Sequence, residues 1–233
     1  EAVWARYSLP EIYHFSAHSL LSSAIATWPE APTVLLREHY RCHPKIINFC
    51  NQKFYGGKLI VMTEDHEEPD VLTMYRTAPG NHARGHLNQR QIDVIRQEVL
   101  PSLERQGYGS IGIITPYRDQ VAAIQTQLGK ELEGATVHKF QGREKDAIIL
   151  TSVDNAITDF VDDPRMLNVA VSRAVKSLAV ITSQDPRNDR TNYGDLARYI
   201  EYNNCAVIES AVYSVFDLLY QGYAEQRQAF RKK

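Results

Sequence analysis

Short runs of apolar, β-branched residues alternate along the chain with segments of helical periodicity, and this alternation restricts the fold more than any other feature. Most of the runs show no polar alternation, which is typical of strands covered on both faces of a parallel sheet. We expect strands at residues 33–36, 71–75, 110–115, 135–140, 147–153 and 177–182. The pattern predicts an α/β fold with a mostly parallel sheet.

Helices are expected in the gaps between these strands. Pro164 suits the first turn of a helix, and Gly56-Gly57 suits the end of one. The predicted helices are 18–28, 44–55, 88–106, 117–128, 164–173, 195–202 and 212–229. The last has an apolar stripe and a basic end, so it either docks on the sheet or leads to a further domain.

The length of 233 residues fits one large domain or two small ones. We expect a lead-in helical segment at residues 1–30, the main domain at 31–210 and a C-terminal helix at 211–233. We expect the chain to be a fragment of a longer protein.

Composition excludes several classes of protein. With 26 Lys and Arg against 28 Asp and Glu, the formal net charge is −2, which excludes a polybasic arm but not a local basic groove. Cys42, Cys50 and Cys205 have no paired spacing, so we expect neither a disulfide framework nor a zinc site, and we expect a cytoplasmic protein. No apolar run approaches the roughly 18 residues of a membrane span, and no signal peptide is visible. The acidic loop 64–70 is interpreted as a solvated turn rather than a metal site, so no metal-binding residues are predicted.

Four polar segments lie where a predicted strand meets a loop or helix, and ligands of open α/β sheets bind outside the carboxyl ends of strands. The first, LREHYRCHP at 36–44, places Tyr40 beside Arg41. The second is IITPYRDQ at 113–120, in which Thr115 can cap the helix that follows. Two interpretations are open: Thr115 is only a helix cap, or the N-terminus of this helix also binds a phosphate.

The third segment, TVHKFQGREKDAIIL, covers residues 136–150. Thr136 and His138 have the same parity on a predicted strand and are expected to project to one side. Gly142 allows close approach of the backbone to a ligand. A dense polar cluster surrounds it, formed by Gln141, Arg143 and Glu144. In the fourth segment, residues 163–181, Arg173 lies near a helix end, where the helix dipole alone would favour it.

Taken in order, these motifs resemble the second RecA-like lobe of superfamily 1 helicases, in the branch with the nonsense-mediated-decay and DNA-repair helicases. The FQGREKD and LNVAVSRA strings are the most specific, and the matching blocks run from residue 36 to residue 181. The resemblance implies a three-layer RecA-like fold. It also implies that Arg41 and Arg173 neutralise charge on the γ-phosphate of ATP, for which the planar guanidinium is suited.

The resemblance implies two further groups of residues. Near the nucleotide it implies Tyr40 at the adenine, Glu144 at the ribose, and Gln141 and Gly142. Against single-stranded DNA or RNA it implies Thr115, Pro116, Tyr117, Thr136 and His138. His138 differs from many members of this branch, so the choice between DNA and RNA stays open.

The chain contains no G-x-x-x-x-G-K-[ST] motif, so nothing in it is expected to hold the β- and γ-phosphates. We expect ATP and Mg²⁺ to be held mainly by an N-terminal RecA-like lobe of the same full-length protein, and this chain alone to be inactive. The alternative is an ATP-independent module, derived from a helicase, that binds nucleic acid or a protein. A nuclease using the acidic loop is disfavoured, because strand-borne carboxylates are lacking.

Overall fold

The computed structural model describes residues 6–7, 9–34, 36–78, 83–129, 132–183 and 185–213. The chain divides into two compact units, Glu1–Arg37 and Glu38–Lys233. The first contains a short 3-10 helix, Glu11–Tyr13, and helix α2, Leu20–Thr27. Ser19 caps the start of α2: its side chain accepts a hydrogen bond from the backbone N–H of Ser22 at 3.1 Å.

The second unit is built on a six-stranded sheet in which all neighbouring strands are parallel, in the order β10-β3-β9-β8-β6-β7. The strands are β3 (Leu72–Arg76), β6 (Ile111–Thr115), β7 (Glu133–Thr136), β8 (Lys145–Thr151), β9 (Ala174–Thr182) and β10 (Ala206–Glu209). The predicted α/β fold with a mostly parallel sheet is confirmed. Two small pairs accompany it: parallel β1 (Glu38–His39) with β2 (Ile60–Val61), and antiparallel β4 (Ala83–Arg84) with β5 (Leu87–Asn88).

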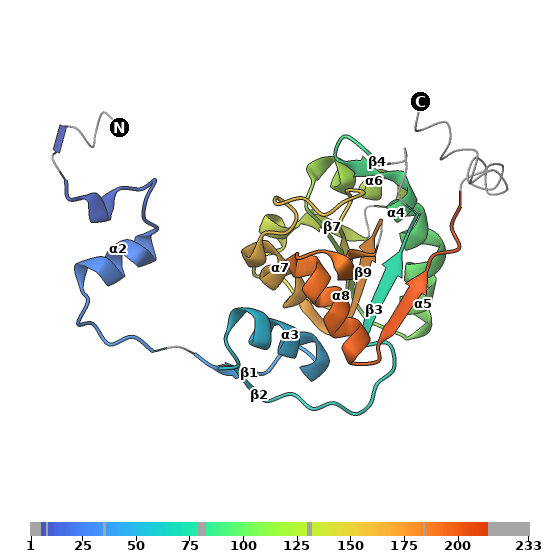
Figure 1. Ribbon diagram of the computed structural model, residues 1–233, viewed down its shortest axis with the longest axis horizontal. Helices are drawn as coiled ribbons and strands as arrows, with labels where there is room; N and C mark the ends of the chain where they lie inside the picture. Colours follow the sequence, from blue (N-terminus) through green and yellow to red (C-terminus); the bar gives the residue numbers. More distant parts are fainter. Residues whose placement is uncertain are drawn as a thin grey trace. The chain divides into compact units, whose positions relative to one another are not determined.

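Helices cover both faces of this sheet (Figure 1). One face carries α3 (Pro44–Phe54), α7 (Pro164–Val171) and α8 (Asn192–Tyr202). The other carries α6 (Arg118–Leu128) and a continuous helical segment formed by α4 (Gln89–Val94), the π-helical turn Ile95–Val99 and α5 (Leu100–Arg105). Among the described residues, no helix is long and apolar enough to cross a bilayer.

Each strand of the sheet feeds two separate cores because successive side chains point to opposite faces. On β8, Ile148 and Leu150 join the core beneath α3, α7 and α8, whereas Ala147 and Ile149 join the core beneath α4 and α6. Full burial of an aliphatic side chain contributes about 1.5–3 kcal/mol. Burial on both faces explains why these strands are apolar without alternation.

Strands β7 and β8 are joined by an unusual connection. They lie on opposite sides of β6, so residues 137–144 cross from the edge where strands end to the edge where strands begin. A 3-10 helix, Val137–Phe140, forms the first half of the crossing, and the ring of Phe140 is fully buried. Phe140 passes directly over Gly112 of β6, where a Cβ atom would lie 2.6 Å from Cζ of the ring. Only glycine leaves room for this crossing.

Two predicted strands and part of a predicted helix need correction. Residues 33, 34 and 36 form no strand, because no neighbouring strand pairs with them and their apolar side chains stay exposed. The predicted strand 135–140 is wrong beyond Thr136, because the chain turns into the 3-10 helix there. The predicted helix 212–229 lies outside the described residues except for Val212 and Tyr213, which are not helical.

Candidate functional site

Arg41 and Arg173 come together at the edge of the sheet where β8 and β9 begin. Arg41 lies between β1 and α3, and Arg173 lies between α7 and β9. The Nη2 atom of Arg41 donates to the carbonyl oxygen of Ser172 at 2.7 Å, and Nη2 of Arg173 donates to the Ser172 hydroxyl at 3.3 Å. Two arginines that are 132 positions apart in the numbering therefore meet at one residue.

Backbone contacts fix the position of both arginines. The segment carrying Arg41 is held against β9, because the N–H of His43 donates to the carbonyl oxygen of Val175 at 2.7 Å. Arg173 also donates from Nε to the carbonyl oxygen of Val169 at 3.2 Å and from Nη1 to that of Arg143 at 3.3 Å. Both guanidinium groups are therefore positioned before any ligand binds.

The arginine pair carries surplus positive charge. The pKa of Arg173 is lowered by burial and by the neighbouring charge of Arg41. Glu144 is the carboxylate that faces the pair, with Oε2 at 3.4 Å from Nη1 of Arg41, and its side chain is 56% exposed. The Nε atom of Arg41 is buried and has no hydrogen-bond partner among the described residues. An anion here would relieve the repulsion, so the pair fits a phosphate group.

The expectation that all four motifs lie outside the carboxyl ends of strands is wrong for the arginine pair. Glu144 precedes β8 and Arg173 precedes β9, so both lie at the amino ends of parallel strands. The reason is that these motifs occupy the loops that enter strands. The predicted residues Thr115 and Thr136 do end β6 and β7 and lie at the opposite, carboxyl edge.

The other residues predicted to contact ATP are exposed on loops near the arginine pair. Tyr40 is 65% exposed, and its hydroxyl donates to the carboxylate of Glu38, which raises the pKa of Tyr40. Gln141 and Gly142 are exposed, and Gly142 has φ of 81° with no atom within 4 Å of where a Cβ would lie. Their roles toward ATP stay predictions.

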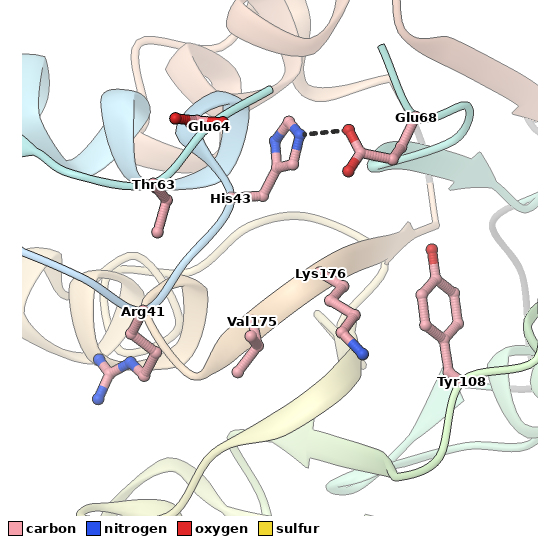
Figure 2. Close-up of a pocket in the computed structure, with 8 residues that line it drawn as sticks. All are labelled: Arg41, His43, Thr63, Glu64, Glu68, Tyr108, Val175 and Lys176. Atoms are coloured by element: carbon pink, nitrogen blue, oxygen red, sulfur yellow. Dashed lines mark hydrogen bonds and ion pairs between the residues drawn. The ribbon is translucent and has the colours of Figure 1, made fainter. Parts of the chain in front are cut away.

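A pocket of about 310 Å³ adjoins Arg41 (Figure 2). It is lined by Arg41, His43, Thr63, Glu64, Glu68, Tyr108, Val175 and Lys176. Figure 2 shows the His43 imidazole turned toward Glu68, and Lys176 between Val175 and Tyr108. Neither the pocket nor these neighbours, apart from Arg41, was anticipated from the sequence.

His43, Asp65 and Glu68 are close enough together to suggest a metal site, but the hydrogen bonds of His43 argue against one. Its Nδ1 accepts the backbone N–H of Lys45 at 3.1 Å and caps α3. Its Nε2 therefore carries the proton and donates to Glu68 at 3.2 Å, with Asp65 at 3.4 Å. A cation would need that nitrogen deprotonated, so this donor set does not fit a metal ion.

The carboxyl edge of the sheet holds the residues predicted to contact nucleic acid. Thr115 is 0% exposed, and its hydroxyl has no partner among the described residues. The predicted helix cap at Thr115 is wrong, because α6 begins after Tyr117 and Thr115 still belongs to β6. Pro116 and Tyr117 follow it and are half-buried. A phosphate contact from Thr115 stays a prediction that requires this end of β6 to open.

A basic groove lies beside these residues, between β7 and α6. Its volume is about 520 Å³, and Arg118, Thr136, Lys139 and Arg143 are among the residues that line it. Glu133 also lines it and forms an ion pair with Arg143, so Arg118 and Lys139 supply its surplus positive charge. Thr136 pairs with Thr115 in the sheet register. His138 is exposed but lies in the 3-10 helix, so the expectation that it shares a strand face with Thr136 is wrong.

A buried amide network that the sequence did not reveal fixes the carboxyl ends of β8 and β9. Gln91 accepts the N–H of Val153 at 3.0 Å and donates to the hydroxyls of Ser152 and Ser183 at 3.2 and 3.0 Å. Asn88 donates to the carbonyl oxygen of Val153 at 2.6 Å. Together these bonds hold Val153 at φ of 67°, a strained conformation for a β-branched residue.

Signals for the missed residues are weak in the sequence. Asn and Gln side chains are usually exposed, so the sequence gives no reason to expect that Asn88 and Gln91 are buried and form a hydrogen-bond network. Arg118 and Lys139 could have been suggested by their position beside predicted nucleic-acid residues, at the strand ends.

An all-parallel sheet covered by helices on both faces, with an arginine pair at the amino ends of its strands and a basic groove along β7, is typical of the RecA-like lobes of superfamily 1 helicases. A family model described as "AAA domain" matches residues 16–185, and the chain belongs to this family. The predicted resemblance to the C-terminal RecA-like lobe of these helicases is thereby confirmed.

Proteins similar to this chain include helicases and regulators of nonsense transcripts. The chain is 29% identical over 187 residues to the 5'-3' DNA helicase ZGRF1 of Mus musculus, covering 72% of this chain and 10% of that protein. It is 31% identical over 192 residues to Regulator of nonsense transcripts 1 of Dictyostelium discoideum, covering 68% of this chain and 14% of that protein. The chain thus spans a small part of the curated relatives it matches.

A solved structure that this chain resembles in part is the C-terminal domain of a possible DNA helicase from Lactobacillus plantarum WCFS1. Its TM-score is 0.45 and its identity 17%, covering 67% of this chain and 96% of that one.

Proposed function

We propose that this chain is the C-terminal motor lobe of an ATP-dependent DNA or RNA helicase. In this proposal, Arg41 and Arg173 supply positive charge to ATP bound at an N-terminal RecA-like lobe of the same protein. The carboxyl edge of the sheet grips single-stranded nucleic acid. The meeting of the two arginines at Ser172 carries the proposal, because a lobe that only bound nucleic acid would have no use for this pair.

ATP hydrolysis transfers a phosphoryl group to water and spreads negative charge over the γ-phosphate oxygens. The guanidinium groups of Arg41 and Arg173 are suited to neutralise this charge, because each presents several N–H donors in a fixed plane. Both are already held by carbonyl oxygens of their own lobe, so little further ordering is needed. Closure of the two lobes would therefore bring prepositioned donors to the phosphate.

We propose that Mg²⁺ is held mainly by the N-terminal lobe. The carboxylate beside the arginines, Glu144, lies in an ion pair with Arg41. The lobe that holds the β- and γ-phosphates is expected to hold the ion as well, through its own carboxylate. Glu144 remains available to a ribose hydroxyl, and Tyr40, Gln141 and Gly142 lie exposed on the adjoining loops. We also propose a cytoplasmic location, from the three unpaired cysteines.

The test uses the full-length protein with Arg41→Ala and Arg173→Ala. Each change should lower ATP hydrolysis by about 10³-fold or more, with single-strand affinity within a few-fold of the unaltered protein. Arg96→Ala is the control, because Arg96 lies on the opposite helical layer and pairs with Asp93.

Unchanged hydrolysis in both arginine variants would contradict the motor proposal. If the full-length protein bound single strands but never hydrolysed ATP, the ATP-independent binding module would be the correct function.

A further inference from the structure

The ring of Tyr117 has a neighbouring ring on each face. The ring of His86, in the turn between β4 and β5, lies parallel to it, with centroids 4.2 Å apart and planes at 5°. Phe160 lies 5.4 Å away at 21°. Two rings on one face of Tyr117 would touch, and no His86–Phe160 ring contact occurs among the described residues. They therefore cover opposite faces, and Tyr117 itself has no free face for a base.

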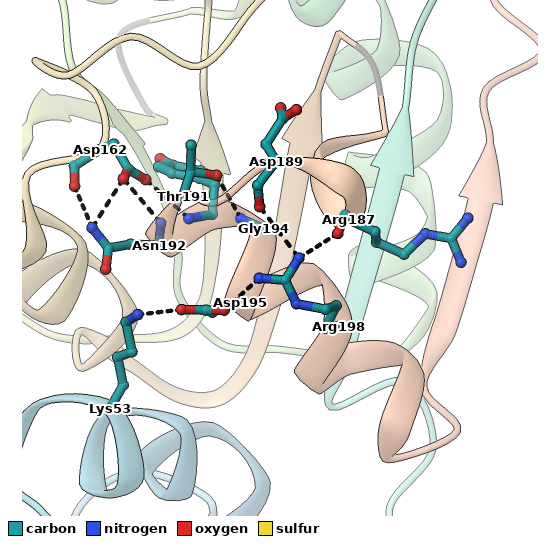
Figure 3. Close-up of polar contacts among 10 residues, drawn as sticks. Lys53, Asp162, Arg187, Asp189, Thr191, Asn192, Gly194, Asp195 and Arg198 are labelled. Carbon is teal, nitrogen blue, oxygen red and sulfur yellow. Dashed lines mark hydrogen bonds and ion pairs between the residues drawn. The ribbon is translucent and has the colours of Figure 1, made fainter.

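Tyr117 and the loop that carries Phe160 are held in place before any ligand binds. The hydroxyl of Tyr117 donates to Asp154 at 2.7 Å, and Asp154 also accepts from Thr158 at 3.2 Å. The loop carrying Phe160 is anchored by Asp162, which accepts the backbone N–H of Asn192 at 2.9 Å (Figure 3). Asp162 also accepts the backbone N–H of Tyr193 at 3.0 Å. A rigid aromatic surface loses little conformational freedom when it binds.

Charge distinguishes the two ends of the stack. Phe160 is 54% exposed, but it follows the exposed Asp159 and belongs to a loop that also contains Asp154, Asp162 and Asp163. His86 is exposed in the segment Ala83–Asn88, which contains Arg84 and no acidic residue. A ligand that carries phosphates is therefore repelled from the Phe160 end and accepted at the His86 end.

We infer that the outer face of His86 is a stacking site for an unpaired nucleobase of the bound strand, with Tyr117 and Phe160 behind it. This inference rests on the proposed grip on single-stranded nucleic acid and names the part of it that contacts a base. Stacking on an aromatic surface tolerates any base, so the site adds affinity without sequence preference. The basic groove beside Tyr117 is suited to the phosphates of the same strand.

The experiment compares two labelled probes on the 233-residue chain: an oligo(dT) strand and an abasic strand of the same length and phosphate count. His86→Ala should weaken oligo(dT) binding by about 5- to 150-fold and leave abasic binding unchanged. The salt dependence of oligo(dT) binding should keep its slope, because no phosphate contact is lost. His86→Tyr should restore affinity, since it returns a flat ring. His66→Ala, an exposed histidine of loop 64–70, is the control.

Oligo(dT) affinity within two-fold of the unaltered chain in His86→Ala, with binding otherwise intact, would overturn the stacking site and leave the proposed function standing. An equal loss on both probes with a shallower salt slope would make His86 a phosphate contact and overturn it too. If the unaltered chain bound neither probe, both the inference and the proposed grip would fail. Circular dichroism of each variant checks that the loss does not come from unfolding.

Discussion

Arg41 and Arg173 are joined through Ser172, whose carbonyl oxygen accepts from the first and whose hydroxyl accepts from the second. Both guanidinium groups are therefore hydrogen-bonded to the same residue although they come from different loops. Their mutual repulsion lowers the pKa of Arg173, after the larger effect of burial. This arrangement leads to the first prediction.

Arg173→Lys should lower ATP hydrolysis by the full-length protein by at least about 10²-fold even though the charge is kept. Lysine cannot bond at once to Val169, Arg143 and Ser172 as the guanidinium does, so its charge is no longer fixed. Steady-state hydrolysis at saturating single-stranded DNA or RNA measures the effect. Arg165→Lys, on the exposed start of α7, should leave the rate unchanged. A fully active Arg173→Lys protein would mean that charge alone is required.

Gly112→Ala should destabilise the chain by about 1–3 kcal/mol. The added Cβ would lie 2.6 Å from Cζ of Phe140 and 3.0 Å from Cγ of Lys145, and Phe140 is fully buried with nowhere to move. Urea unfolding measures the change. The combination with Phe140→Leu is the internal control: the double variant should lose less stability than the sum of the single losses, because the smaller side chain makes room. Simple additivity would show that the two residues do not collide.

Gln91→Leu should lower the free energy of unfolding by about 2–4 kcal/mol, because it leaves the N–H of Val153 and two serine hydroxyls short of partners inside the protein. Gln127→Leu offers a matched change, since Gln127 bonds to Gln89 on the exposed surface. Chemical unfolding of the two variants side by side makes the comparison. Equal losses would show that the buried network stabilises the chain no more than the surface pair Gln89–Gln127 does.

The stability of the chain should depend on Tyr117 at alkaline pH. Burial, and then the hydrogen bond to Asp154, raises the pKa of Tyr117 to about 12, above the value near 10 of an unfolded tyrosine. This stabilisation is complete below about pH 10 and is lost as the pH rises toward 12. Its size is about 1 kcal/mol after allowance for solvent screening of a partly exposed ring.

Tyr199 has a raised pKa of about 12 as well, so the measured quantity is the difference between the unaltered chain and Tyr117→Phe. The difference in unfolding free energy should be constant up to about pH 10 and shrink above it. Tyr202→Phe, on the exposed end of α8, is the control. A difference that does not change with pH would contradict the role of the hydroxyl.

Apolar runs predicted the sheet well because burial on both faces leaves a clear signal in composition. β8 and β9 were found with small boundary errors. The failures have physical causes. Residues 33, 34 and 36 belong to a mostly apolar run but have no neighbouring strand to pair with, and pairing cannot be read from a single segment. β10 was missed because Ala206–Glu209 is a short, half-buried edge strand whose apolar run is no longer than many that form no strand.

The candidate site was likewise predicted in part. The motifs identified Arg41 and Arg173, but only the fold placed them at the edge where strands begin. Local pattern cannot tell a loop that enters a strand from one that leaves it when both are polar. The environment of Tyr117 was also out of reach, since His86 and Phe160 are 31 and 43 positions from it along the chain. Contacts of this kind depend on tertiary packing, which leaves no local trace.

The connection between β7 and β8 contributes both to the basic groove and to the arginine pair. Arg143 at its far end lines the basic groove with its side chain and holds Arg173 with its carbonyl oxygen. Phe140, clamped over Gly112, is a fixed point in the same connection. A substitution that moves this connection would therefore change the lining of the groove and the position of the Arg173 guanidinium together.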